Sequence, residues 1–198
     1  MEVETGCRVA LGLLVVGLAL VGIPARWRAD RVGGRVSRAA DPGWFWLLMV
    51  VVGPPVPLVG GAFLLEPRWV AALAFPAPAW VRLLGVPLGV GGLLLFAWMF
   101  RHLGLNVTST SMPRASASLV TTGPYRWVRH PMYTAAMILA IAATLLTANW
   151  MVAVGGAAAW SLLAARSVLE EERLVEKFGE AYRDYQRRTG RFWPRVTR

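Results

Sequence analysis

The stretch "PMYTAAMILAIAATLLTANWMVAVGGAAAWSLLAA", from Pro131 to Ala165, is almost purely apolar over its 35 residues. One helix needs about 20 residues to cross the hydrocarbon core of a bilayer. The stretch is therefore too long for one crossing and just long enough for two short ones. The tripeptide "TAN" at 147–149 is the expected break, so the sequence predicts a tight helical hairpin.

The composition of the whole chain is that of a membrane protein with several crossings. Its 198 residues are 56% hydrophobic and 16% charged, whereas soluble domains carry roughly 25% charged residues. The net charge of +10 comes from Lys and Arg that lie between apolar runs and in the tail. Because such residues typically face anionic lipid headgroups from cytoplasmic loops, we expect membrane lipids and no nucleic acid as partners.

Three further apolar runs precede the hairpin, and each predicts one crossing. The second run is interrupted by "GPPVP" at 53–57, whose prolines should kink or break the helix. Glu2 and Glu4 precede the first run, whereas a secretory signal begins with positive charge, so we expect that run to be a retained crossing. The three runs are residues 8–23, 44–65 and 80–100.

The C-terminal half contains two long polar segments. Residues 101–130 are expected to form a loop, and a loop of about 30 residues is long enough to suggest a functional one. Residues 166–198 are highly charged but carry an apolar stripe at helical spacing, which predicts that the last crossing continues into a cytoplasmic tail helix. The stripe consists of Val168, Val175, Phe178, Tyr182 and Tyr185.

These elements predict an all-α polytopic membrane protein with about five transmembrane helices. Residues 1–100 form an N-terminal region of three crossings. Residues 101–198 combine the loop of residues 101–130, here called the polar connection, with the hairpin and the tail helix. The polar segments 24–43, 101–130 and 166–198 hold 18 of the 21 Lys and Arg residues. Since cytoplasmic loops are enriched in these residues, we expect the N-terminus outside and the C-terminus in the cytoplasm of a bacterial inner membrane.

Two groups of polar residues flank the apolar hairpin. His130 directly precedes Pro131, which suits the first turn of a helix, and the unpaired N–H groups of that turn can bind a carboxylate. Arg166 and Glu170 share a helix face at the other end of the run. A second interpretation stays open for each group: His130 and Tyr133 as interfacial anchors, and Arg166 with Glu170 as a surface ion pair.

Three successive glutamates, Glu170, Glu171 and Glu172, follow Arg166 within two helical turns. Ionisable groups near membrane depth usually face a cavity or a charged partner. Helical geometry places Glu171, rather than Glu170, nearer the middle of the apolar stripe. The residues alone therefore leave open which glutamate faces the bundle.

Metal chemistry finds little support in the sequence. Cys7 is the only cysteine and the chain has two histidines, so we expect neither an internal disulfide nor a structural zinc site. The motifs HExxH, GxSxG, GxGxxG and the Walker loop do not occur. We therefore expect no metal ligands in this chain.

The segments "LVTTGPYRWVRHPMY" and "RSVLEEERLVEKFGEAYRDYQRRTGRFWP", separated by the apolar hairpin, carry a family resemblance. Together they resemble the isoprenylcysteine carboxyl methyltransferase family and the related phospholipid N-methyltransferases. The resemblance covers residues 100–195 and joins GPY, RHPxY, RxxxEE, LxxxFG and YxxY in the family's order. It implies an integral membrane enzyme that uses S-adenosyl-L-methionine, with residues 101–198 as the catalytic region.

The resemblance also implies roles for individual residues. Arg166 is the candidate catalytic residue and should face the methyl acceptor, while a strand-like stretch should line the cofactor through its backbone. Some relatives have a histidine where Ala117 stands, so any side-chain contact made there is absent in this chain. The implied cofactor-binding residues are Ala117, Ser118, Leu119, Val120, Tyr125, His130, Pro131, Met132, Tyr133 and Glu170.

The expected function is methylation of a lipophilic acceptor, such as an isoprenylcysteine carboxylate, at the membrane–cytosol interface. A phospholipid or a thiol is an alternative acceptor. A membrane sterol or lipid reductase is an alternative of another class, because the four arginines of residues 101–130 would suit the 2′-phosphate of NADPH. A non-enzymatic scaffold would leave the match to RHPMY and the Arg166–Glu170 spacing as coincidence.

Overall fold

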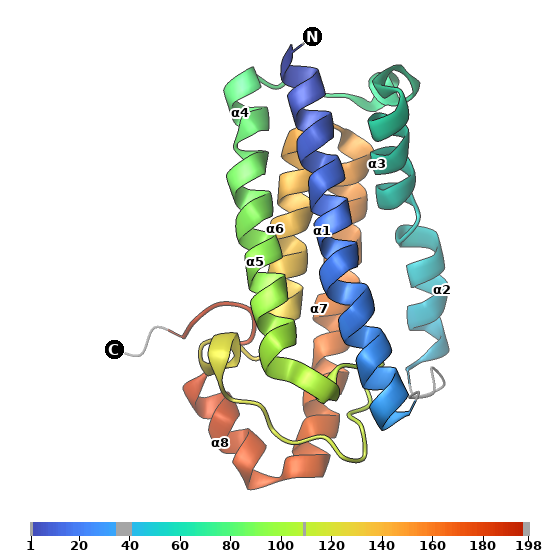
Figure 1. Cartoon of the computed structure of the whole chain (residues 1–198). Helices are drawn as coiled ribbons and strands as arrows, with labels where there is room; N and C mark the ends of the chain where they lie inside the picture. Colours follow the sequence, from blue (N-terminus) through green and yellow to red (C-terminus); the bar gives the residue numbers. More distant parts are fainter. Residues whose placement is uncertain (1, 35–40, 109, 196–198) are drawn as a thin grey trace.

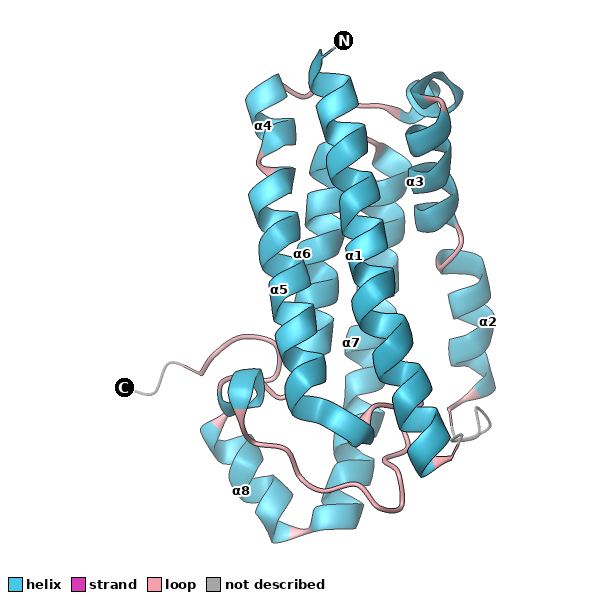
Figure 2. Ribbon diagram, viewed as in Figure 1, coloured by secondary structure: helices cyan, strands magenta, loops and turns pink. Residues whose placement is uncertain are grey.

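The computed structural model describes residues 2–34, 41–108 and 110–195, and the regular structure in these ranges is helical. The long helices stand side by side along a common direction (Figures 1 and 2). Two isolated β-bridges occur among the described residues, but no strand is formed there. The all-α class predicted from the apolar runs is confirmed.

The predicted N-terminal crossings are all present as helices. The interruption of the second crossing by its prolines is also confirmed, because one helix ends at Val52 and the next begins at Pro55. Pro55 occupies the first turn of its helix, where a missing N–H costs no hydrogen bond. The elements are α1 (Glu2–Gly33), α2 (Gly43–Val52), α3 (Pro55–Leu65), η2 (Pro67–Leu73), α4 (Ala79–Leu83) and α5 (Gly85–Leu103).

Helix α1 is longer than the predicted crossing of residues 8–23. It continues through Pro24 and the arginine-rich sequence that follows, which the polar composition alone had assigned to a cytoplasmic segment. A proline removes one hydrogen bond and kinks a helix, but it does not stop a chain whose next residues favour helix. The helix instead ends before Gly34, which has a φ of 72°. Residues 35–40 of the predicted polar segment 24–43 lie outside the described residues.

The predicted helical hairpin is confirmed with its break at 147–149. Helix α6 (Pro131–Thr147) ends at Ala148, which takes the left-handed conformation, and α7 (Trp150–Phe178) follows. Asn149 stabilises the turn twice, since its Oδ1 accepts from Met151 N at 2.9 Å and its Nδ2 donates to Val70 O at 3.1 Å. A polar residue with both donor and acceptor therefore sets where the hairpin reverses.

The predicted continuous tail helix is divided in two. Helix α7 ends at Gly179, whose φ of 57° is accessible to glycine at little cost, and α8 (Glu180–Arg188) begins directly after it. The bend turns α8 across the end of the bundle (Figure 1). Tyr182 and Tyr185 are consequently buried against the polar connection instead of lying along α7.

Four helical segments are long and apolar enough to cross a membrane, and α6 adds a shorter apolar helix. The four segments are Glu2–Gly33, Gly43–Leu65, Ala79–Asn106 and Trp150–Phe178. With α6 they account for the five predicted crossings. The chain is therefore an integral membrane protein.

The crossings pack through small residues, as helices in lipid commonly do. A Cβ on Gly85 would lie 2.8 Å from the carbonyl oxygen of Ala142, so only glycine allows α5 to approach α6 this closely. Near the N-terminal end of the bundle, Cys7 is fully buried in an apolar cluster that joins α1, α3, η2 and α6. The single cysteine thus packs as a core residue.

The two ends of the bundle differ in charge. At the end that carries the N-terminus, two arginines cap carbonyl groups at helix C-termini: Arg8 donates to Leu64 O at 2.6 Å, and Arg82 donates to Leu146 O at 2.8 Å. Arg82 also pairs with Glu4 at 2.7 Å. The polar connection and α8 lie at the opposite end (Figure 1). The fold therefore collects most of the hydrogen-bonding side chains at one end of the bundle.

Candidate active site

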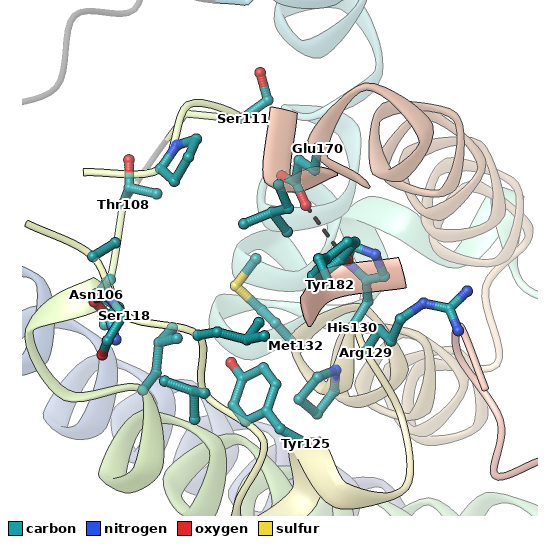
Figure 3. Close-up of a pocket in the computed structure, with 18 of the residues that line it drawn as sticks. Asn106, Thr108, Ser111, Ser118, Tyr125, Arg129, His130, Met132, Glu170 and Tyr182 are labelled. Atoms are coloured by element: carbon teal, nitrogen blue, oxygen red, sulfur yellow. Dashed lines mark hydrogen bonds and ion pairs between the residues drawn. The ribbon is translucent and has the colours of Figure 1, made fainter. Parts of the chain in front are cut away.

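One cavity at the α8 end of the bundle is lined by all eleven of the predicted site residues. They come from the polar connection, the start of α6 and the polar end of α7. Figure 3 shows Tyr125, His130 and Met132 on one side of the cavity, with Asn106 and Ser118 across from them. The predicted residues of the connection that line it are Ala117, Ser118, Leu119, Val120 and Tyr125, those of α6 and its start are His130, Pro131, Met132 and Tyr133, and those of α7 are Arg166 and Glu170.

The polar connection is held over the cavity by contacts to other elements. Arg114 is its main anchor: Nε donates to Val107 O at 2.8 Å, and Nη2 pairs with Asp30 of α1 at 2.6 Å. Lys177 of α7 donates to Ala115 O at 2.9 Å. The stretch 117–120, predicted to be strand-like, is irregular and has no ladder partner. Ala117 N instead donates to Arg114 O at 3.0 Å and Ser118 N to Asn106 Oδ1 at 3.2 Å, and all four residues line the cavity.

The turn before α6 is fixed by α8. The 3₁₀ turn η4 (Gly123–Arg126) begins at a glycine with a φ of 60°, and a Cβ there would collide with the His102 ring. Tyr185 donates its hydroxyl to Tyr125 O at 2.6 Å. Burial raises the pKa of Tyr185, so the hydroxyl keeps the proton that it donates. Helix α8 therefore holds Tyr125 against the cavity.

The chain after α8, residues 190–192, runs along the residues that precede α6, and we call it the strap. Arg129 N donates to Gly190 O at 2.9 Å, and His130 N donates to Arg191 O at 3.0 Å. Thr134 then donates its hydroxyl to Phe192 O at 2.7 Å. This strap fixes the backbone of the RHPMY motif from outside the cavity.

The side chain of Glu171 joins these segments, and it is almost completely buried. Its Oε1 accepts from Arg129 Nε at 2.8 Å and contacts His130 Nε2 at 3.1 Å. Its Oε2 accepts from Arg191 Nη2 at 2.8 Å and from Gln186 Nε2 at 3.1 Å. One carboxylate thus connects α7, the approach to α6, α8 and the strap.

His130 lies between two carboxylates. Its Nδ1 is 3.4 Å from Glu170 Oε2, and its Nε2 is 3.1 Å from Glu171 Oε1. Burial by itself lowers the pKa of His130, but the hydrogen bonds to Glu170 and Glu171 outweigh it and the net shift is upward. The arrangement therefore favours a doubly protonated imidazolium between the two glutamates.

Glu170 is the glutamate that lines the cavity. Tyr133 donates its hydroxyl to Glu170 Oε1 at 2.6 Å, and Arg166 Nε is 3.5 Å from the same oxygen. Glu172, in contrast, is exposed on the outer face of α7. The three adjacent glutamates thus lie in three different environments. The helical argument had favoured Glu171 as the inward-facing residue. Glu171 is indeed buried, but it contacts the strap, and Glu170 is the one that lines the cavity.

Arg166 is nearly buried, with 8% of its side chain exposed, and it lines the cavity. Its Nη2 lies 3.4 Å from Asp41 Oδ2, and its guanidinium carbon lies 4.9 Å from the centre of the Phe45 ring. The interpretation as an ion pair on a lipid-exposed surface is therefore wrong for Arg166. A buried guanidinium at the cavity wall can instead hold an anionic group.

Sequence reasoning missed several residues that the cavity brings together. Arg26 reaches it because α1 continues beyond Pro24, and Arg129 lines it next to the predicted His130. The apolar stripe already pointed to Tyr182 and Tyr185, which line the cavity from α8. Phe178 of the same stripe also lines the cavity, and the residues not predicted are Phe100, Leu103, Asn106, Val107, Thr108, Thr110, Ser111, Pro113 and Leu174.

A family model described as phospholipid methyltransferase matches residues 80–181, which is just over half of the 198 residues. The nickel-cobalt-cadmium resistance protein NccN of Alcaligenes xylosoxydans xylosoxydans is 33% identical over 84 residues, 42% of this chain and 39% of that protein. The protein-S-isoprenylcysteine O-methyltransferase of Dictyostelium discoideum is 34% identical over 70 residues, 35% of this chain and 30% of that protein. The chain thus spans well under half the length of these curated relatives.

The fold also resembles a solved structure, that of the eukaryotic intramembrane Ras methyltransferase ICMT (isoprenylcysteine carboxyl methyltransferase). The TM-score is 0.58 at 23% sequence identity, and the match covers 91% of this chain and 60% of that one. Almost the whole chain therefore shares the arrangement of helices seen in that membrane protein.

The position of His130 predicts a pH dependence of stability. Because its folded-state pKa is raised above the unfolded value of about 6.5, its stabilising contribution is full below that pH and is lost as the pH rises through the folded pKa. The unfolding free energy of the detergent-solubilised protein should therefore decline from pH 6.5 upward, and His130→Gln should flatten that decline. Chemical denaturation at several pH values measures both slopes.

His102→Gln is the matched control, since the His102 ring contacts the Thr122 hydroxyl rather than a carboxylate. Equal flattening in the two variants, or an unchanged slope in His130→Gln, would contradict the linkage to the glutamates.

Proposed function

The chain belongs to the phospholipid methyltransferase family, and on that basis we propose that it is an integral membrane methyltransferase dependent on S-adenosyl-L-methionine. It methylates a lipophilic acceptor, such as an isoprenylcysteine carboxylate, at the membrane–cytosol interface. The observation that carries the proposal is that one cavity, at one end of the helix bundle, is lined by all eleven predicted site residues. The printed name of the Dictyostelium relative and the fold of the Ras methyltransferase support a carboxylate acceptor.

The chemistry of the cavity fits the proposed cofactor. When bound, S-adenosyl-L-methionine supplies a methyl group activated on a positively charged sulfur. Glu170 offers a carboxylate to its cationic groups, and Tyr125 with Met132 offers apolar surface for the adenine. Residues 117–120 line the cavity, and their backbone carbonyl oxygens can accept hydrogen bonds from the adenosine. We assign the ten predicted cofactor-binding residues to this task.

Arg166 is proposed to orient the acceptor. A guanidinium can hold a carboxylate through two parallel hydrogen bonds, and its burial keeps competing water away. A carboxylate acceptor needs no general base, so the protein has only to position the nucleophile and strip part of its solvent. A thiol or amine acceptor would have to lose a proton to a general base. Glu170 is the carboxylate at the cavity wall, and it already accepts a hydrogen bond from the Tyr133 hydroxyl.

The proposed location is a bacterial inner membrane, with the N-terminus outside and the C-terminus in the cytoplasm. The polar connection and α8 at one end of the bundle carry the basic residues expected of a cytoplasmic face (Figure 1). The cavity then opens on the side where a soluble cofactor is available.

Topology can be tested by labelling introduced cysteines with a membrane-impermeant maleimide. Ser116 and Ala72 are exposed, Ser116 on the polar connection and Ala72 in η2 at the opposite end. In intact cells Ala72→Cys should be labelled and Ser116→Cys should be protected until the membrane is permeabilised. The reverse pattern would overturn the proposed orientation. Cys7 is buried and should give no background.

Cofactor binding should appear as thermal stabilisation. S-adenosylhomocysteine is expected to raise the Tm of the purified protein in a concentration-dependent way, and NADPH is expected to leave it unchanged. Glu170→Ala should weaken the effect, whereas Glu172→Ala, on the exposed face, should retain it. A shift with NADPH alone would favour the reductase alternative, and equal losses in the two variants would refute the assignment of Glu170.

The role of Arg166 can be separated from packing by Arg166→Lys, which keeps the charge but loses the two-pronged geometry. Turnover of a carboxylate acceptor should fall by roughly 30- to 1000-fold, the equivalent of about 2–4 kcal/mol, while S-adenosylhomocysteine affinity stays nearly constant. Arg183→Lys, in an exposed pair with Glu180, is the control and should be silent. Near-normal turnover in Arg166→Lys would remove this residue from the acceptor site.

A further inference from the structure

The start of α2 contacts Arg166 although it lies outside the part of the chain that the family model matches. Asp41 and Phe45 both approach the guanidinium, and neither of them lines the cavity. Asp41 is separated from Arg166 by 125 positions in the sequence. The contact is therefore a product of the tertiary fold, and it reaches the one cavity residue assigned to the methyl acceptor.

Asp41 has a completely buried carboxylate. Its Oδ1 accepts from Ser111 N at 2.9 Å and from the Ser111 hydroxyl, while its Oδ2 faces Arg166 Nη2 at 3.4 Å. Arg173 Nη1 lies 4.0 Å from Asp41 Oδ1. A carboxylate without access to water must be paired in this way, because an unpaired buried charge is strongly unfavourable. Both oxygens of the Asp41 carboxylate thus have partners, which hold the side chain in one position.

Phe45 supplies an aromatic face to the same guanidinium. The ring is 2% exposed, and its centre lies 4.9 Å from the guanidinium carbon of Arg166. A guanidinium within about 6 Å of an aromatic face is attracted by the ring quadrupole, most strongly where water is excluded. The neighbouring Trp44 is half exposed and has no such contact in the described structure.

The three contacts constrain different parts of Arg166. Glu170 faces Nε, Asp41 faces Nη2, and the guanidinium carbon lies over the Phe45 ring. A free arginine side chain has many rotamers, and ordering them costs conformational entropy. Contacts that fix the guanidinium before the acceptor arrives remove that cost from the binding step.

We propose that Asp41 and Phe45 are positioning residues that orient the Arg166 guanidinium toward the methyl acceptor. Asp41 also holds Ser111, which lines the cavity from the polar connection, so it links the connection to the acceptor arginine. The inference rests on the proposed function, in which Arg166 holds the acceptor. It extends the acceptor site to a segment of the chain before residue 80.

The test combines substitution with a double-mutant cycle in the full-length protein. Asp41→Asn keeps the shape and removes the charge, and Phe45→Leu removes the aromatic face while leaving an apolar side chain. Each is expected to lower turnover of an isoprenylcysteine acceptor by about 10- to 100-fold, because small misplacement of a binding group has effects of that size. The affinity for S-adenosylhomocysteine should stay within about twofold of wild type, since the cofactor contacts are unchanged.

Asp184→Asn and Trp69→Leu are the matched controls. Asp184 pairs with Arg187 on the exposed face of α8, and Trp69 is exposed in η2 at the opposite end of the bundle. Both should retain wild-type turnover. Adding Asp41→Asn to Arg166→Lys should lower turnover little further than Arg166→Lys alone, because residues that act through one group are non-additive.

Two results would show that Asp41 supports the cavity generally and would overturn the inference. One is a double variant whose loss of turnover equals the product of the losses in Asp41→Asn and Arg166→Lys. The other is a loss of cofactor affinity in Asp41→Asn as large as its loss of turnover. Phe45→Leu keeps the test decisive if Asp41→Asn folds poorly, as judged by its melting temperature. An active wild type with unchanged turnover in both variants overturns the inference alone. A wild type that neither binds S-adenosylhomocysteine nor methylates any acceptor overturns the proposed function and this inference with it.

Discussion

The buried carboxylate of Glu171 is the interaction on which the cavity depends. Its two oxygens contact Arg129, His130, Gln186 and Arg191 within 3.2 Å. These partners belong to the approach to α6, to α8 and to the strap, so one carboxylate joins three segments that are separate in the sequence. Removing one partner from a buried ion pair typically costs about 3–5 kcal/mol. The geometry of the RHPMY motif therefore rests on one charged group outside the cavity.

Helical geometry gives the adjacent residues Glu170 and Glu171 different roles. Successive residues on a helix point about 100° apart, so Glu170 can line the cavity while Glu171 faces the strap. His130 lies between them and contacts both carboxylates. The cavity wall and its support are thus coupled through one imidazole. A change in either glutamate therefore alters the environment of His130.

The N-terminal crossings are more than a membrane anchor. Through Arg8 and Arg82 they cap carbonyl groups at one end of the bundle, and through Asp41 and Phe45 they surround Arg166 at the other. The matched family model begins at residue 80. The residues before position 80 are recognisable in the sequence only as apolar runs. They nevertheless complete the environment of the proposed acceptor site.

The sequence by itself determined the number of crossings, the proline interruption and the hairpin break, because apolar run length, proline and Asn149 act locally. It also identified eleven residues of one cavity through motif resemblance. Only the tertiary structure decided that α1 extends past Pro24, that the tail bends at Gly179, and that Glu171 supports the strap. The contact between Asp41 and Arg166 joins residues 125 positions apart. No periodicity or local propensity records such a pairing, since it exists only after the helices pack and exclude water from both charges.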